Sequence, residues 1–94
     1  MNHEVVRTVL KRKRTVEILE YLSESGPKNY TDIEEAFDTS SDTVSDTLAL
    51  LDEYNLVDRR EKTKKDVRYE ITGRGTELLE LVQAISDLLT EEND

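Results

Sequence analysis

The segment over residues 31–82 constrains the fold of this chain more than any other feature. Its hydrophobic pattern predicts, in order, a short helix, a tight turn, a second helix, a strand, a basic loop, a second strand and a last helix. Asp38-Thr39 supplies the turn, and Val67, Tyr69 and Ile71 alternate with charged residues as in a half-buried strand. This order is the one that a helix-turn-helix followed by a β-hairpin requires.

Capping residues set the helix boundaries that we predict. Residues 31–34, Thr-Asp-Ile-Glu, read as a capping box, and Ser40 or Ser41 should cap the second helix. Asn55 suits the left-handed conformation at a helix C-terminus, and Thr72 should cap the last helix. We therefore expect a helix-turn-helix over residues 31–54, a hairpin over 57–72 with its basic tip at 59–66, and a last helix over 73–90.

Apolar residues at helical spacing predict the core and a dimer contact. Val44, Leu48 and Leu51 follow an i, i+4, i+7 pattern and should face the core. Residues 3–24 form one or two further helices, which Gly26-Pro27 ends. The last helix is too apolar on one face to stand alone in water, so we expect it to pair with a second copy. The residues expected at this seam are Val5, Val9, Leu78, Val82, Ile85 and Leu89. The alternative is that the apolar face of the last helix covers the core of its own monomer.

Length and composition limit the classes of protein to consider. We treat residues 1–94 as one domain with a single small core. The chain contains no Cys and only one His, His3, so the usual nucleophile–base pairs and thiolate metal sites are excluded. We expect no enzyme activity, no metal and no cofactor. The longest apolar run, residues 48–51, is too short for a membrane span or a signal peptide, which predicts a soluble cytoplasmic protein without a membrane partner.

Charge is distributed unevenly along the chain. There are 13 basic and 22 acidic residues, a net charge of −9. Positive charge is confined to residues 1–14 and 57–75, whereas residues 15–56 contain one Lys and eleven acidic residues. This asymmetry is typical of a protein with one face that meets nucleic acid. The acidic remainder favours an origin in a salt-loving archaeon, where the screening length in molar salt is about 3 Å. The alternative is a mesophilic protein that is merely acidic.

Two blocks of sequence resemble the winged helix-turn-helix transcriptional regulators of the MarR, ArsR and PadR-like group. The first comprises residues 31–37, 41–45 and 48–57, and the second comprises residues 69–75 followed by Leu78-Leu79. The size and acidity resemble small regulators or phage-type repressors of halophilic archaea. The resemblance implies a mainly α fold with a small β-hairpin wing, extra N- and C-terminal helices, and a homodimer bound to double-stranded DNA.

The chain departs from the pattern of this group at two positions. Asn55 replaces the Gly that usually precedes the first wing strand, which is physically acceptable. Asp46 stands where the second helix of the motif commonly carries a basic residue, and Asp42 lies one turn earlier. An acidic residue near a helix N-terminus is favoured by the helix dipole, so both Asp residues have a structural interpretation beside base recognition.

In this fold the second helix of the motif enters the major groove with its N-terminal half. The residues that we expect there are Ser41, Asp42, Thr43, Ser45, Asp46 and Thr47, with Tyr30 beside them as a candidate phosphate contact. The wing offers Arg59, Arg60, Lys62, Lys64, Lys65 and Arg68 for phosphates or the minor groove. The alternative for the wing is a solvated hairpin whose charges protect an exposed edge. At most two of residues 11–14 can face a phosphate, and we take these to be Lys13 and Arg14.

The function predicted on these grounds is a homodimeric, sequence-specific repressor of a pseudo-palindromic operator. A different class is the main alternative, namely a winged helix used for protein contacts, such as a subunit of the transcription machinery or an anti-repressor. The acidic second helix of the motif favours that alternative, and the basic wing opposes it. A sequence-neutral chromatin protein is a third hypothesis.

Overall fold

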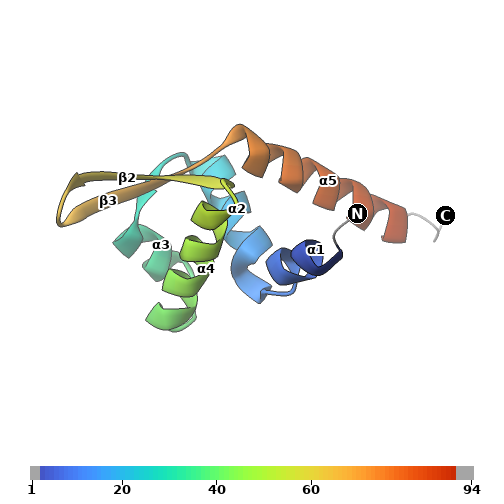
Figure 1. Cartoon of the computed structure of the whole chain (residues 1–94), viewed down its shortest axis with the longest axis horizontal. Helices are drawn as coiled ribbons and strands as arrows, with labels where there is room; N and C mark the ends of the chain where they lie inside the picture. Colours follow the sequence, from blue (N-terminus) through green and yellow to red (C-terminus); the bar gives the residue numbers. More distant parts are fainter. Residues whose placement is uncertain (1–2, 91–94) are drawn as a thin grey trace.

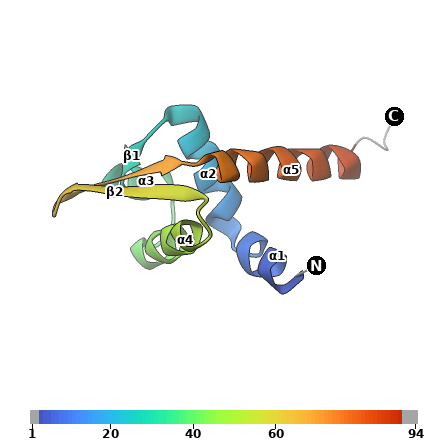
Figure 2. The ribbon, with the colours of Figure 1, turned by 45° about the horizontal axis from the view of Figure 1, so that its top comes forward.

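The computed structural model describes residues 3–90 and folds them into five helices and a three-stranded antiparallel sheet (Figure 1). The fold class is as predicted, mainly helical with one β-hairpin. The elements are α1 (His3–Leu10), α2 (Lys13–Ser25), β1 (Lys28–Asn29), α3 (Tyr30–Ala36), α4 (Ser41–Glu53), β2 (Val57–Thr63), β3 (Asp66–Ile71) and α5 (Gly73–Thr90). The hairpin and α5 extend in opposite directions from the body formed by α1 to α4 (Figures 1 and 2). No helix in the described part of the chain is long and apolar enough to cross a membrane.

The core lies where α2, α3 and α4 pack against the sheet. Val44, Leu48 and Leu51 are buried, as their spacing predicts. The other buried apolar side chains are Val9, Ile18, Leu19, Leu22, Ile33, Leu50, Leu56, Val57 and Tyr69. Each such aliphatic side chain contributes about 1.5–3 kcal/mol when it leaves water, so this cluster holds the helix-turn-helix on its sheet.

The N-terminal caps of α3 and α4 come from side chains that precede each helix. The Asn29 side chain accepts a hydrogen bond of 2.8 Å from the Asp32 amide, so α3 begins at Tyr30. The predicted capping box at residues 31–34 is therefore wrong, because Thr31 already lies inside the first turn. Ser40 rather than Ser41 caps α4, since its hydroxyl accepts from the Thr43 amide at 3.1 Å.

Asn55 and Thr72 join the two ends of the hairpin. Asn55 has a φ of 60° and, within residues 3–90, no other non-glycine residue has a positive φ. This left-handed residue ends α4, as predicted, and turns the chain into β2. The Thr72 hydroxyl donates to the Asn55 carbonyl at 2.6 Å and accepts from the Gly75 amide at 3.1 Å. One side chain therefore caps α5 and fixes its first turn beside the start of the wing.

The hairpin lies where it was predicted, but its strands are longer and its tip is shorter than predicted. The strand order is β1-β3-β2, and β2 pairs with β3 from Val57↔Ile71 to Thr63↔Asp66. The turn is therefore confined to residues 64–65, and residues 59–63, expected as part of a loop at the tip, lie on a strand. Only Val57 of β2 is buried, so no alternation of apolar and polar residues marks this strand in the sequence.

Helix α5 packs on the body only through its N-terminal half. Gly75 is buried, and Leu78, Leu79 and Val82 are half-buried. Beyond them the apolar residues are exposed, with fractional exposures of 57% for Leu81, 50% for Ile85, 67% for Leu88 and 68% for Leu89. The C-terminal half of α5 projects from the body (Figure 2), and its apolar side chains are uncovered in the single chain.

Candidate nucleic-acid interface

The outer face of α4 is exposed and carries no basic residue. Burial of Val44, Leu48 and Leu51 turns the opposite side of the helix to solvent. The exposed residues on that side are Ser41, Asp42, Ser45, Asp46 and Ala49, and Thr43 is half-buried beside them. Residues 30–53, which include α3 and α4, contain eight acidic residues and no Lys or Arg. Chemically, this surface offers hydroxyls, carboxylates and one methyl group.

Thr47 does not belong to this face, contrary to the prediction. It is 1% exposed, and its hydroxyl donates to the Thr43 carbonyl at 2.7 Å. Position 47 lies three residues after Val44 and one before Leu48, which places it on the buried side of the helix. Its hydroxyl is satisfied within α4 and cannot reach a nucleic acid.

Tyr30 lies against the first turn of α4. Its hydroxyl donates to the Ser41 carbonyl at 3.0 Å and is 2.9 Å from the Ser41 hydroxyl and 3.3 Å from that of Ser45. The ring is half-buried and packs on the core. Tyr30 is thus connected to the exposed face of α4 rather than pointing freely into solvent.

Arg14 packs within the body of the protein, and its predicted contact with a phosphate stays a prediction that the contacts of its side chain disfavour. Its guanidinium binds Glu17 at 2.7 Å, reaches the Asp38 carbonyl at 3.4 Å and lies over the Phe37 ring. The Arg14 side chain is only 16% exposed, because α2 packs beside the turn between α3 and α4. The side chain of Lys13 lies outside the described part of the structure, so its predicted role stays a prediction.

Each arginine of the wing is next to a carboxylate two residues away on its own strand. Arg59 is 3.5 Å from Glu61, Arg60 is 3.0 Å from Asp58 and Arg68 is 3.4 Å from Asp66. These pairs are exposed, so each contributes little to stability. A hydrogen bond to the Tyr69 side chain, with further contributions from the charges of Tyr69 and Glu61, raises the pKa of the Arg59 guanidinium.

The lysines of the wing are not paired in this way. Lys62, Lys64 and Lys65 are exposed at or beside the hairpin turn, and none forms an ion pair with another residue in the range 3–90. Arg60 and Arg68 are directly opposite each other across the hairpin, where like charges repel. With Lys62 they line a shallow hollow of about 220 Å³. The wing therefore concentrates positive charge that an anion would neutralise.

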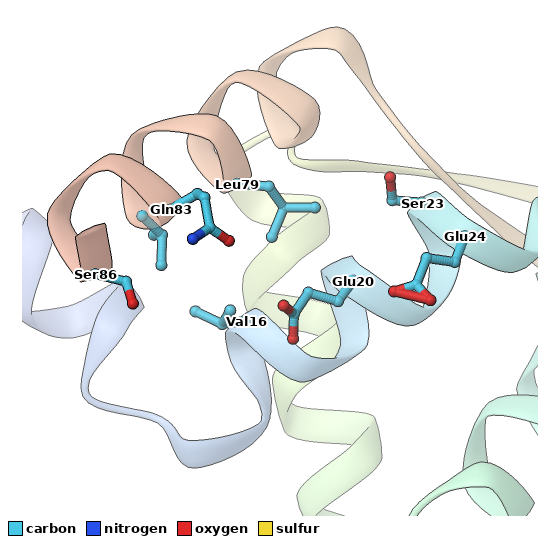
Figure 3. A pocket seen from close by; sticks show the side chains of 8 residues that line it. Val16, Glu20, Ser23, Glu24, Leu79, Gln83 and Ser86 are labelled. Atoms are coloured by element: carbon cyan, nitrogen blue, oxygen red, sulfur yellow. The ribbon is translucent and has the colours of Figure 1, made fainter. Parts of the chain in front are cut away.

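A groove of about 310 Å³ lies between α2 and α5, on elements other than the wing (Figure 3). Val16, Leu79 and Val82 form its apolar part. Its polar lining consists of Glu20, Ser23, Glu24, Gln83 and Ser86. Sequence patterns did not reveal this groove, because its two walls are far apart in the chain. Within residues 3–90 no group of three or more His, Cys, Asp or Glu side chains is placed to hold a metal ion.

Solved structures with the same fold are winged helix regulators. The reduced form of the transcriptional regulator YodB from B. subtilis is 25% identical, with a TM-score of 0.78 over 97% of this chain and 94% of that chain. The homodimeric winged helix-turn-helix DNA-binding domain Mb0332 from Mycobacterium bovis, a possible ArsR-family regulator, is 28% identical, with a TM-score of 0.73 over 90% and 78% of the two chains. A MarR-family protein from Enterococcus faecalis V583, at 16% identity, shares the fold with a TM-score of 0.78 over 97% and 87%.

The fold is therefore that of the winged helix transcriptional regulators, as the resemblance in sequence implied. The chain belongs to the HVO_A0114 family, whose model matches residues 9–73. That range contains α2 to β3, with the helix-turn-helix and the wing, and stops at the first residue of α5. No curated protein matches the chain.

Proposed function

We propose that this protein is a sequence-specific DNA-binding transcriptional regulator that acts as a homodimeric repressor of a pseudo-palindromic operator. The observation that carries the proposal is the wing, whose lysines Lys62, Lys64 and Lys65 extend from an acidic body without ion-pair partners in the described structure. Phosphate contacts from such side chains supply affinity and register but no sequence information. The basic surface also includes Arg59, Arg60 and Arg68. Each of these guanidinium groups contacts DNA when a phosphate displaces the neighbouring carboxylate from it.

Helix α4 reads the major groove with its N-terminal half. Its exposed hydroxyls belong to Ser41 and Ser45, with Thr43 half-buried beside them. Asp42 and Asp46 accept hydrogen bonds from base amino groups, and Asp42 also lies in the first turn, where the helix dipole favours a carboxylate. Specificity then comes from α4 and most of the affinity from the wing.

Two copies pair through α5, supported by the exposed Leu81, Ile85, Leu88 and Leu89. The homodimeric state of the Mb0332 DNA-binding domain supports the same arrangement. One expected seam residue is excluded, because Val9 is only 6% exposed and packs in the core of its own monomer. Val6, which is 51% exposed on the same helix, replaces it. Leu78 packs against the core of its own monomer and Val82 is half-buried, so the apolar face of α5 serves both the monomer and the dimer.

The protein acts in the cytoplasm without enzyme activity or a cofactor, and occlusion of a promoter is the mode of repression. Its acidic surface suits a salt-rich cell, because at molar salt repulsion between this surface and DNA extends only about 3 Å. At such salt concentrations the affinity for DNA depends on the direct contacts, at hydrogen-bond distance, between protein and DNA.

The proposal is tested by selecting bound sequences from a random DNA pool at 0.1 M and at 2 M KCl. An enriched two-fold-symmetric sequence, with half-sites about one helical turn apart or a multiple of it, is the expected result. Enrichment that survives 2 M KCl supports the salt-rich setting. Binding without enrichment would instead indicate a sequence-neutral chromatin protein.

A second candidate function is a winged helix for protein contacts. The observation that favours it is the surface of α3 and α4, with eight acidic residues and no base over residues 30–53. Absence of DNA binding at both salt concentrations would support this function and reject the regulator.

A further inference from the structure

The hydroxyl of Tyr30 is in contact with three oxygen atoms of α4. It is 3.0 Å from the Ser41 carbonyl, 2.9 Å from the Ser41 hydroxyl and 3.3 Å from the Ser45 hydroxyl. Tyr30 is the first residue of α3, directly after β1, and its ring packs on the core. The position of its hydroxyl is therefore set by the body of the protein, not by α4 alone.

The chemistry of these contacts determines where the protons lie. A tyrosine hydroxyl carries one proton, and a carbonyl oxygen can only accept. The Tyr30 proton therefore goes to the Ser41 carbonyl. The serine hydroxyls, which are within hydrogen-bond distance of the same phenol oxygen, then satisfy it by donating their own protons. Both serine oxygens are left with lone pairs that accept from outside the protein.

The rest of the exposed face of α4 is also made of acceptors. Asp42 and Asp46 are exposed carboxylates. The helix, SDTVSDTLALLDE, contains no Asn, Gln, His, Lys or Arg that would donate to a base. Thr47 donates inward to the Thr43 carbonyl, and the Thr43 hydroxyl is 2.8 Å from that of Ser40. The outer face of the first two turns is thus a surface of hydrogen-bond acceptors.

We infer that α4 reads the exocyclic amino groups of adenine and cytosine, and that Tyr30 is the positioning residue that makes Ser41 and Ser45 acceptors. In the major groove the adenine N6 and cytosine N4 groups are the donors, whereas guanine and thymine present only acceptors and a methyl group. An acceptor surface excludes phosphates as well, which leaves the backbone to the wing. The inference rests on the proposed function, since it names the base atoms that this regulator recognises.

Base analogues in the selected site test the acceptor surface directly. Purine in place of adenine removes the N6 amino group, and 7-deazaadenine removes the N7 acceptor but keeps N6. At positions that face α4, purine should weaken binding of the wild-type protein about fivefold per contact with a serine hydroxyl and by more than about tenfold per contact with an Asp carboxylate. The 7-deazaadenine site should bind within about twofold of the parent site. The opposite order, with N7 required and N6 dispensable, would overturn the inference.

The Tyr30→Phe variant tests the positioning role. Without the phenol oxygen, the Ser41 and Ser45 hydroxyls are free to donate, so selection with this variant should admit guanine or thymine at positions where the wild type requires adenine or cytosine. Tyr54→Phe is the matched control, because the Tyr54 side chain lines a hollow with α1 residues, away from the exposed face of α4. A merely structural role for Tyr30 would lower the melting temperature and leave the selected sequence unchanged, and that result rejects the positioning role.

The sequence selected by the wild-type protein distinguishes a failure of this inference from a failure of the proposed function. If the wild-type protein selects no sequence, the regulator itself is rejected and the inference with it. If it selects a palindrome but binding does not depend on the adenine N6 or cytosine N4 groups that face α4, the regulator stands and the acceptor surface is wrong. Should Tyr30→Phe not fold, the analogue series on the wild-type protein still decides the base atoms, and Ser45→Ala replaces it as the test of the serine contact.

Discussion

The guanidinium carbon of Arg14 lies 5.7 Å from the centroid of the Phe37 ring. Phe37 in turn meets Tyr21 edge-on, with ring centroids 5.7 Å apart. Arg14 and Tyr21 belong to α2, and Phe37 is the residue that ends α3. A cation and an aromatic ring of α2 thus hold Phe37 from two sides, which fixes the turn that leads into α4.

Arg14→Ala should destabilise the protein rather than weaken its contact with phosphates. Loss of the cation–π contact and of the hydrogen bonds should lower the free energy of unfolding by about 1–2 kcal/mol. For a domain of this size that is a fall in melting temperature of about 4–16 °C. Arg12→Ala, which removes an exposed arginine two residues away, should leave the melting temperature within about 2 °C. If the Arg14 variant kept its stability but lost salt-dependent DNA affinity, Arg14 would contact a phosphate, as the sequence predicted.

Gly75→Ala should be strongly destabilising because at this residue α5 closely approaches Leu56, directly before β2, and the end of β3. A Cβ atom at position 75 would collide with the Leu56 carbonyl oxygen and lie 2.7 Å from Ile71 Cγ1. Backbone atoms cannot move aside cheaply, so the expected cost is about 1–3 kcal/mol. Gly73→Ala is the control, since a Cβ there meets nothing within 4 Å. Urea unfolding of the two variants measures the difference, and equal midpoints would show that α5 shifts to make room.

Asn55→Gly should stabilise the protein, whereas Asn55→Ala should destabilise it. Asn55 has a φ of 60°, which glycine adopts without steric cost and alanine does not. The expected changes are a gain of up to about 1 kcal/mol for Gly and a loss of about 1 kcal/mol for Ala. Thermal unfolding of both variants checks the sign. Destabilisation by Gly would mean that the Asn55 side chain makes a contribution of its own.

Features that depend on one local segment were predictable from the sequence. Ser40, Asn55 and Thr72 each act on a backbone within a few residues of themselves, and such capping depends on residue type and spacing. The burial of Val44 and Leu48 likewise follows from helical period alone. These features led to the correct fold class.

Features that depend on distant segments were not predictable. Arg14 looks like part of a basic run, and only the packing of α2 beside Phe37 shows that it is half enclosed. Thr47 is a polar residue on the buried side of α4, so a rule that places polar residues outside misassigns it. The Asn29 cap is a local feature that was nevertheless missed, because Thr31 offers a competing motif two residues later. The DNA contacts expected from α4 and the wing stay predictions, and the acceptor character that we propose for α4 depends on Tyr30, which belongs to another element.

Substitution of the wing lysines should reduce the salt dependence of DNA binding. Each lysine that neutralises a phosphate contributes about 0.9 to the slope of log affinity against log salt. Lys64→Ala and Lys65→Ala should each lower that slope by about 0.9 and weaken all sequences alike. Arg60→Ala should have a smaller effect, because its guanidinium already binds Asp58 at 3.0 Å. Filter binding at several KCl concentrations measures the slopes. An unchanged slope for both lysines would assign the wing to edge protection instead.

Ile85→Glu should convert the proposed dimer into monomers. Ile85 is 50% exposed in the single chain and lies between Leu81 and Leu89 on the uncovered face of α5. At about 100° per residue these three side chains fall within about 80° of one another around the helix, so a charge at position 85 is placed in the middle of the seam. A buried unpaired carboxylate at such a centre typically costs at least about 2 kcal/mol, or a 30-fold loss of dimer affinity.

The matched control for this charge is Gln83→Glu. Gln83 is exposed on the same helix, about 200° around the axis from Ile85, and its amide donates to Asp87 at 2.9 Å. Sedimentation equilibrium in 2 M KCl, where repulsion between acidic chains is screened, should show dimers for the wild type and Gln83→Glu and monomers for Ile85→Glu. The monomeric variant should retain its fold by circular dichroism but bind a full palindrome no better than a half-site, because one copy contacts only one half. A wild-type monomer under these conditions would contradict pairing through α5 and leave the apolar face of this helix to a different partner.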